Sequence, residues 1–436
     1  MYIDIIANLF RSVMKTIVNA ILFIMTLTFL CQCDKNDPYP NINIPDNNFL
    51  NALIELGVDK NGDGIVSPNE AEMITSLDVG SKDIIDMTGI EYFVNLDSLD
   101  CQWNEITSLD VSNITGLKFL QCMSNQITLL DISYNSELIF LDCGYNRLCY
   151  LNVSKNSTLE YLNLRCNCGR LNNLDVSNNT ALKSLDCGGN PITSLDVSNN
   201  TALANLECWE NQLTSLDVSK NYALENLHCQ RNQLTNLDLS YNTALKYLVC
   251  ADNQVSNLDL SYNTALEYIE CCRNQLTTLD VSNNTALKSL WCTGSQLLTS
   301  IEIPDGNTLE ELYCQNNQLT NLDASNNTAL KWMYCDGNQL ASLDVSDNTA
   351  LTFIQCEGNQ LTALDVSTNT ALTSLYCHNN QLTTLDISNN TALDNVYIKD
   401  MPSLYKVCVW EIPFPPDGVY IYATNSPNVY FTTDCN

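Results

Sequence analysis

A twelve-residue segment near the N-terminus carries oxygen donors at the spacing that calcium needs. It runs from Asp59 to Glu70 and fits D-x-[DN]-x-[DN]-G-x5-E at every position. Such a loop supplies oxygen ligands from alternate positions, a bidentate carboxylate at its end, and a glycine at its sharp turn. We therefore predict one calcium ion held by Asp59, Asn61, Asp63, the Ile65 carbonyl, Ser67 and Glu70. The alternative is an acidic turn that holds no metal.

Two helices would have to position this loop. Asp46 can cap a helix that carries Phe49, Leu50, Leu53 and Ile54, and Pro68 can begin a second helix at the end of the loop. Since the chain has one such loop, a structural ion in an N-terminal cap over residues 46–73 is favoured over a calcium sensor.

From Ile74 onward the sequence repeats with a period of mostly 21 residues. A representative coil is Leu203-x-x-Leu206-x-Cys208-x-x-Asn211-x-Leu213, after which Asp and Ser recur. A unit of this length cannot bury its own apolar side chains, so neighbouring coils must stack and share one core. The pattern resembles that of the leucine-rich repeat family, with cysteine at the third apolar position.

This resemblance covers residues 74–400 and implies an α/β-type repeat solenoid. The expected shape is a horseshoe with a parallel β-sheet on the concave face, a mostly irregular convex side and a small helical N-terminal cap. We assign residues 74–403 to the repeats and 404–436 to a C-terminal cap. The first coil is closer to the internalin-like form, and the chain as a whole is similar to leucine-rich repeat surface lipoproteins of the Bacteroidetes.

Cysteine recurs at one position of the coil, which in the family is an apolar position that points into the core. We predict that these side chains are small, inert, buried hydrophobes. In-register parallel Cβ vectors do not favour disulfide geometry, and an odd number of thiols cannot pair completely. The thirteen ladder cysteines are at 101, 122, 143, 187, 208, 229, 250, 271, 292, 314, 335, 356 and 377.

Cysteines outside the ladder are candidates for disulfides. Cys408 and Cys435 bracket a proline-rich segment after the last full repeat, and the ending resembles the C-terminal cap of such surface proteins, so we predict that they pair. Cys149 and Cys168 lie at nearly equivalent lateral positions in neighbouring coils and can also pair, with Cys166 as the competitor for Cys149.

The N-terminal residues 1–33 predict an export signal. Lys15 precedes an apolar run of about 14 residues, which is too short to span a bilayer and typical of a signal-peptide core. Translation can begin at Met14. The end of this segment resembles a bacterial lipoprotein signal, so we expect Cys33 to be lipidated, with Cys31 as the second candidate, and residues 34–45 to form a tether. A conventionally cleaved, unlipidated product is the alternative.

Composition and spacing argue against several classes of function. A net charge of −31 repels nucleic acid and anionic lipid headgroups. The two histidines lie seven coils apart and no catalytic motif is present, so we predict that the chain is not an enzyme. Aspartates that recur before serine favour turn capping over a row of bound cations.

The strand positions that vary between coils predict a recognition surface. They change from acidic side chains in the N-terminal coils to aromatic ones in the C-terminal coils. The alternative is that these aromatic rings only stabilise a bare sheet by stacking across strands. The aromatic residues that would form the patch are Trp291, Tyr313, Trp332, Tyr334, Phe353 and Tyr376.

Together these features predict a monomeric cell-surface binding module, an adhesin or ligand-capture protein. It would take a protein or a carbohydrate on its concave face and reach the outer membrane or cell surface only through its N-terminal lipid anchor. The runner-up is a structural envelope solenoid without a dedicated ligand.

Overall fold

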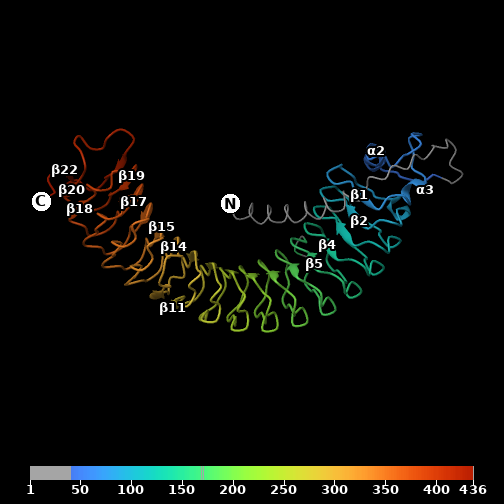
Figure 1. The fold of residues 1–436 in the computed structure, drawn as a ribbon, viewed down its shortest axis with the longest axis horizontal. Coiled ribbons are helices and arrows are strands. Elements are labelled where there is room, and N and C mark those ends of the chain that lie inside the picture. Colours follow the sequence, from blue (N-terminus) through green and yellow to red (C-terminus); the bar gives the residue numbers. More distant parts are fainter. Residues whose placement is uncertain (1–40, 168, 170, 436) are drawn as a thin grey trace.

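The computed structural model describes residues 41–435, apart from 168 and 170. The coils stack into an open arc with the N-terminal helices at one end and the C-terminal strands at the other (Figure 1). The predicted solenoid is confirmed: short parallel strands line the concave side, and the convex side is mostly irregular. The predicted lipidation site, Cys33, and the whole signal segment lie outside the described residues.

Each main strand has three residues and is centred on the second leucine position of its coil. In β7, for example, Leu206 is buried while Asn205 and Glu207 are half-buried on the concave face. Alternation along a strand explains this pattern, because successive side chains point to opposite faces. Leu206 pairs in register with Leu227 of β8, so identical positions form columns along the solenoid.

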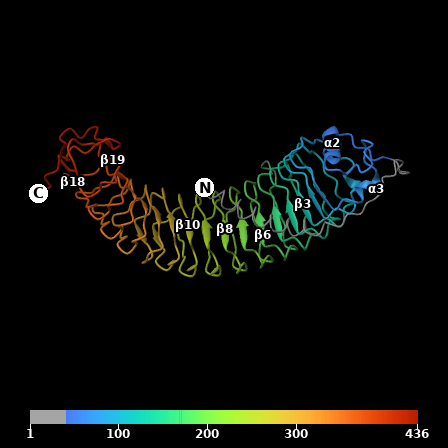
Figure 2. The ribbon, with the colours of Figure 1, turned by 45° about the horizontal axis from the view of Figure 1, so that its top comes forward.

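Seventeen strands form one parallel sheet, in which each strand pairs with the next one along the chain (Figure 2). They are β1 (Ser76–Asp78), β2 (Ser98–Asp100), β3 (Phe119–Gln121), β4 (Phe140–Asp142), β5 (Tyr161–Asn163), β6 (Ser184–Asp186), β7 (Asn205–Glu207), β8 (Asn226–His228), β9 (Tyr247–Val249), β10 (Tyr268–Glu270), β12 (Ser289–Trp291), β14 (Glu311–Tyr313), β15 (Trp332–Tyr334), β16 (Phe353–Gln355), β17 (Ser374–Tyr376), β19 (Asn395–Tyr397) and β21 (Tyr420–Tyr422).

Two smaller parallel sheets form at the second half of some coils. One pairs β11 (Thr278–Asp280) with β13 (Ser300–Glu302). The other joins β18 (Thr384–Asp386), β20 (Lys406–Cys408) and β22 (Tyr430–Thr432). Since β21 extends the main sheet and β22 extends this one, residues 404–432 continue the stacking of the repeats as an irregular last turn.

The helices lie near the N-terminal end of the described chain. Helix α2 (Asn47–Glu55) begins at Asp46, whose carboxylate accepts the Asn48 and Phe49 N–H groups. Helix α3 (Pro68–Ala71) begins with proline at its first position. A single 3-10 turn, η1 (Ile90–Tyr92), follows β1. In the described part of the chain, no helix is long and apolar enough to cross a membrane.

Asparagine amides join neighbouring coils behind the strands. The Asn232 Nδ2 donates to the carbonyls of Cys208 (2.9 Å) and Cys229 (3.1 Å), and its Oδ1 accepts the Leu213 N–H at 2.9 Å. A second, buried asparagine column recurs on the convex turns, where the Asn242 Nδ2 donates to the carbonyls of Val218 and Asn221. These bonds satisfy backbone groups that a three-residue strand leaves unpaired.

The chain turns sharply two residues after each ladder cysteine. The backbone there is left-handed, with φ of 55° at Arg231 and 54° at Asp252. Glycine takes this position at Gly337 and Gly358, where the same conformation costs it nothing sterically. The turn directs residues at this edge outward in a row that follows the stacking axis.

Candidate ligand-binding surface

The concave face presents two columns of half-buried side chains, one from the first and one from the third residue of each strand. Of the six predicted aromatic residues, five stack in a single continuous row, because strand pairing places their rings beside one another. Phe353 comes from a first position, but its ring lies between those of Tyr334 and Tyr376. Gln355, which holds the third position of that strand, turns away and donates to Glu357 Oε1 at 2.8 Å.

We call this row the aromatic column, and it extends further than predicted. The centroids of neighbouring rings are 4.1 to 5.3 Å apart, and most pairs are close to parallel. Trp332 stands in the neighbouring column, in register with Glu311 and Phe353. The members are Trp291, Tyr313, Tyr334, Phe353, Tyr376, Tyr397 and Tyr422.

Tyr422 was missed because residues 404–436 were assigned to a cap. Its sequence signal was a tyrosine pair two positions apart, Tyr420 and Tyr422, which places both side chains on one face of a strand. A separate stack of Phe119, Phe140 and Tyr161 lies on the N-terminal strands, where the Phe140 and Tyr161 ring centroids are 4.3 Å apart.

The N-terminal half of the face is acidic. Burial raises the pKa of Asp100 from 3.8 to about 6, although hydrogen bonds from Gln102 oppose the change. Burial also raises the pKa values of Asp142 and Asp186. Arg165 is the cation of this region, and its guanidinium lies 3.7 Å from the Asp186 carboxylate. The carboxylates therefore stand in a poorly solvated column that favours a positively charged neighbour.

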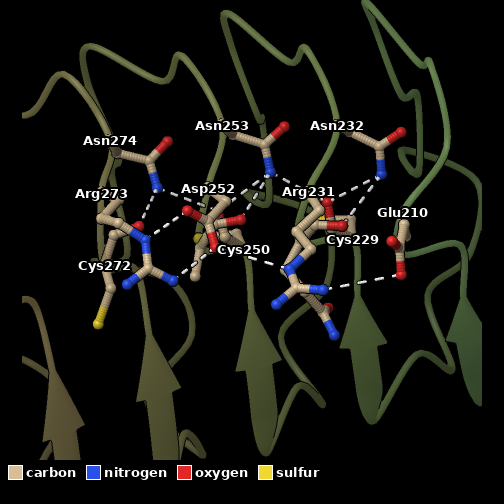
Figure 3. Close-up of polar contacts among 12 residues, drawn as sticks. Glu210, Cys229, Arg231, Asn232, Cys250, Asp252, Asn253, Cys272, Arg273 and Asn274 are labelled. Carbon is tan, nitrogen blue, oxygen red and sulfur yellow. Dashed lines mark hydrogen bonds and ion pairs between the residues drawn. The ribbon is translucent and has the colours of Figure 1, made fainter.

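Alternating charges stabilise the edge of the sheet at the centre of the arc. Figure 3 shows Glu210, Arg231, Asp252 and Arg273 in consecutive coils, beside the asparagines that join those coils. Arg273 donates to both oxygens of Asp252, through Nε to Oδ1 and through Nη2 to Oδ2 at 2.7 Å. Arg231 lies 3.7 Å from Glu210 and 3.9 Å from Asp252. The positive charges at this edge are thus balanced within it.

The ladder cysteines are buried, as predicted. All thirteen have 0% exposure and free thiols. Burial raises their pKa values, to about 12 for Cys229, so the nucleophilic thiolate is suppressed.

The cysteines outside the ladder differ from these. Cys408 and Cys435 are disulfide bonded, with Cα atoms 5.5 Å apart. Within the described residues, Cys149, which is exposed, and Cys166, which is half-buried, form no disulfide. The predicted partner of Cys149, Cys168, lies outside the described residues, so that pairing stays a prediction.

The predicted calcium loop follows α2 and ends within α3, and its acidic groups accept hydrogen bonds from its own backbone. Asp59 accepts the Gly62 and Gly64 N–H groups at 2.7 and 2.9 Å. Glu70, only 6% exposed, accepts the Lys60 N–H at 2.7 Å and the Ser67 N–H and hydroxyl at 3.0 Å.

The remaining side-chain donors of the loop complete the same network. Asn61 Oδ1 accepts the Asp63 N–H at 2.8 Å, and Asp63 Oδ1 accepts the Ile65 N–H at 3.1 Å. The donor set has the chemistry that calcium takes. Within the described residues, however, the carboxylates of this loop do not converge as a three-ligand cluster.

The described residues hold one group of three metal-ligating side chains close together: Asp386, Cys408 and Cys435. Because both cysteines are disulfide bonded, this group is not a metal site. The aspartates that recur before serine cap turns, as predicted. Asp217, for example, accepts the Ser219 N–H at 2.9 Å, and hydrogen bonds from Ser219 lower the pKa of Asp217.

Known proteins share this architecture. No family model matches the chain. The solved functional domain of InlJ from Listeria monocytogenes, described as including a cysteine ladder, is 36% identical. The match covers 83% of this chain and 79% of that chain, with a TM-score of 0.69. The chain belongs to the internalin-like leucine-rich repeat family.

Two further similarities agree with this assignment. Internalin J of Listeria monocytogenes serotype 4b is 37% identical over 71 residues, which span 16% of this chain and 8% of that protein. The leucine-rich repeat protein LIC12759 of Leptospira interrogans is 19% identical, with a TM-score of 0.56 over 84% of this chain, and shares the fold. The cysteine column is therefore a feature that this internalin-like chain shares with the InlJ domain.

Proposed function

We propose that this internalin-like chain is an exported binding module that takes a protein ligand on its concave face, with the aromatic column as the anchor. The observation that supports this most strongly is the column itself. Seven rings follow one another on a sheet face that no described helix covers. At about 4.8 Å per strand, the column is roughly 30 Å long.

The orientation of the rings favours a protein over a carbohydrate. A sugar stacks its apolar side on an open ring face, but inside the column each ring face is covered by the next ring. The edges of these half-buried or exposed tyrosine rings are accessible from the concavity, while the Tyr397 and Tyr422 hydroxyl groups hydrogen-bond to each other. Tyrosine and tryptophan edges of this kind are enriched at protein interfaces and at binding hot spots.

Ring stacking alone would suffice for the runner-up function, a structural solenoid without a ligand. Cross-strand aromatic pairs stabilise a sheet by up to about 1 kcal/mol each. The two functions are separable by experiment because one requires a partner and the other does not.

The test compares capture by wild-type protein with capture by Tyr334→Ser/Tyr376→Ser. The matched control is Tyr241→Ser/Tyr262→Ser, which changes two exposed tyrosines outside the strands. Host or community extracts are passed over each immobilised protein and the retained proteins are identified by mass spectrometry. We expect a ligand that is retained by wild type and control but lost from the column variant. Identical retention by all three proteins would favour the structural solenoid.

We also propose export through the N-terminal signal and anchoring by a lipid on Cys33. The segment before Cys33 supports this through its lysine, its short apolar run and the polar residues that follow it. Mass spectrometry of the native protein should find a diacyl or triacyl group on Cys33. A free N-terminus there would exclude the anchor but not the binding function.

We further propose that the loop from Asp59 to Glu70 holds one structural calcium ion. Its donor set and its position between two helices support the proposal. The hydrogen bonds of Glu70 to the loop backbone also suit the alternative, an acidic turn that is complete without metal. The calcium dependence of stability distinguishes the two.

A further inference from the structure

The acidic and aromatic halves of the concave face meet at strands β10 and β12. Glu270 of β10 is in register with Trp291 of β12, the first ring of the aromatic column. The two faces of this indole differ. Tyr313 covers one face with a centroid distance of 4.1 Å, whereas Tyr268 flanks the other at 6.5 Å and a tilt of 43°. Trp291, the ring at the N-terminal end of the column, thus has one face on which no ring is stacked.

Hydrogen bonds fix the orientation of this ring. The Trp291 Nε1–H donates to Ser289 Oγ at 2.8 Å, and the Ser289 hydroxyl donates to Glu311 Oε2 at 2.8 Å. The indole N–H is therefore satisfied within the protein. What Trp291 offers to a ligand is the electron-rich face of a pre-oriented ring.

Glu270 places a carboxylate beside that face. Its Oε2 accepts the Tyr268 hydroxyl at 3.1 Å, and no ion pair found among the described residues includes Glu270. Arg273 and His228 both interact electrostatically with Glu270, but Arg273 is held by two hydrogen bonds to Asp252 (Figure 3), and burial lowers the pKa of His228. The charge of Glu270 therefore remains available to a ligand.

We infer that Trp291, Tyr268 and Glu270 form a seat for an arginine side chain of the protein ligand. This inference rests on the proposed function and names the chemistry that its ligand must carry. A guanidinium can lie flat on the indole face and donate in its plane to the carboxylate, whereas the compact ammonium of lysine can do only one of these well. The net charge of −31 further favours a basic partner.

The seat also fixes how a ligand lies along the face. Its arginine sits at β10 and β12, and its apolar residues lie over the column toward β21. One residue of an extended chain advances roughly 3.3 Å, so the apolar side chains would stand several residues away from the arginine and on one side of it in the ligand sequence. A ligand in the reverse direction would show the mirrored spacing, and each ligand should show one of the two.

A random dodecapeptide display library is the probe. Selection on the wild-type protein should enrich peptides that carry arginine at a fixed spacing from aromatic or aliphatic residues. The best peptide is then synthesised with arginine and with citrulline, which keeps the shape and removes the charge. Calorimetry should show about tenfold weaker binding of the citrulline peptide to wild type, and equal binding of both peptides to Glu270→Gln. The matched control Glu302→Gln, at an exposed strand end outside the main sheet, should behave as wild type.

The outcomes of this experiment distinguish the arginine seat from the binding surface as a whole. Selected peptides without arginine, or an arginine preference that Glu270→Gln leaves intact, would overturn the seat while the column remains a binding surface. Peptides that bind Tyr334→Ser/Tyr376→Ser as tightly as wild type would overturn the proposed function itself. Circular dichroism and thermal melting of each variant establish that the fold is retained.

Discussion

At the residue scale, the ladder cysteines show how burial at one position of the repeat sets the reactivity of the side chain there. A thiol at 0% exposure between leucines is a small hydrophobe, and burial opposes its ionisation. We therefore expect iodoacetamide to modify Cys229 only after denaturation, whereas exposed Cys149 is modified in the native protein unless it is paired with Cys168. Peptide mapping by mass spectrometry measures both sites in one sample. Native labelling of Cys229 would contradict a closed core.

The buried carboxylates predict a dependence of stability on pH. Burial raises the pKa of Asp100 to about 6, with Asp78 and Asp142 adding repulsion, whereas in the unfolded chain it ionises near its ordinary value of 3.8. Between these values the folded state keeps a proton that the unfolded state has lost. Stability should therefore fall as the pH rises from about 4 to 6, and this contribution should be constant above that window.

Substitution isolates that contribution from the rest of the chain. Asp100→Asn should reduce the fall in the free energy of unfolding by about 1 to 2 kcal/mol. This value is smaller than the full pKa shift would give, because solvent screens the charge at this half-buried site. Urea unfolding at pH 4.5 and 7 measures it, and exposed Asp347→Asn serves as the control. Equal pH profiles for wild type and Asp100→Asn would show that Asp100 is ordinarily solvated.

At the element scale, the N-terminal helices and their loop close one end of the solenoid. If the loop binds calcium, the ion binds the folded cap and not the unfolded chain, so a calcium concentration tenfold above Kd stabilises the cap by about 1.4 kcal/mol. Chelation should then lower hydrogen-exchange protection at residues 74–120 and leave residues 330–400 unchanged, since stacked coils fray from their ends.

The control for that experiment uses two neighbouring glutamates. Glu70→Gln should remove the calcium dependence of the melting temperature, whereas Glu72→Gln, which changes an exposed residue two positions later, should retain it. The comparison concerns the difference with and without calcium, because Glu70 also accepts hydrogen bonds that glutamine would weaken. Wild-type melting that is insensitive to chelator would establish the acidic turn.

At the scale of the whole molecule, the C-terminal disulfide closes the other end. The Cys408–Cys435 bond spans 27 residues and joins β20 to the end of the chain. By loop entropy it contributes roughly 3 to 4 kcal/mol. Cys408→Ser/Cys435→Ser should raise hydrogen exchange in residues 384–432 while residues 100–250 keep their protection. Equal protection in all coils would show that stacking alone holds the last turn.

The sequence by itself determined the repeat, the parallel sheet and the burial of the cysteine column. These follow from local periodicity, because every 21-residue coil must hide the same apolar positions against its neighbours. It also predicted the helix that begins at Asp46 and the turn caps such as Asp217, since both depend on side chains that bond backbone groups two or three residues away.

Tertiary structure decided which of the variable side chains meet. Ring stacking depends on register and rotamers across strands, so only the fold could show that Phe353 joins the aromatic column, that Trp332 stands outside it and that Tyr422 extends it. The same holds for the unstacked face of Trp291 beside Glu270. The repeat predicts which positions lie side by side, but it does not set the rotamers of the variable side chains, and these decide where a ligand can bind.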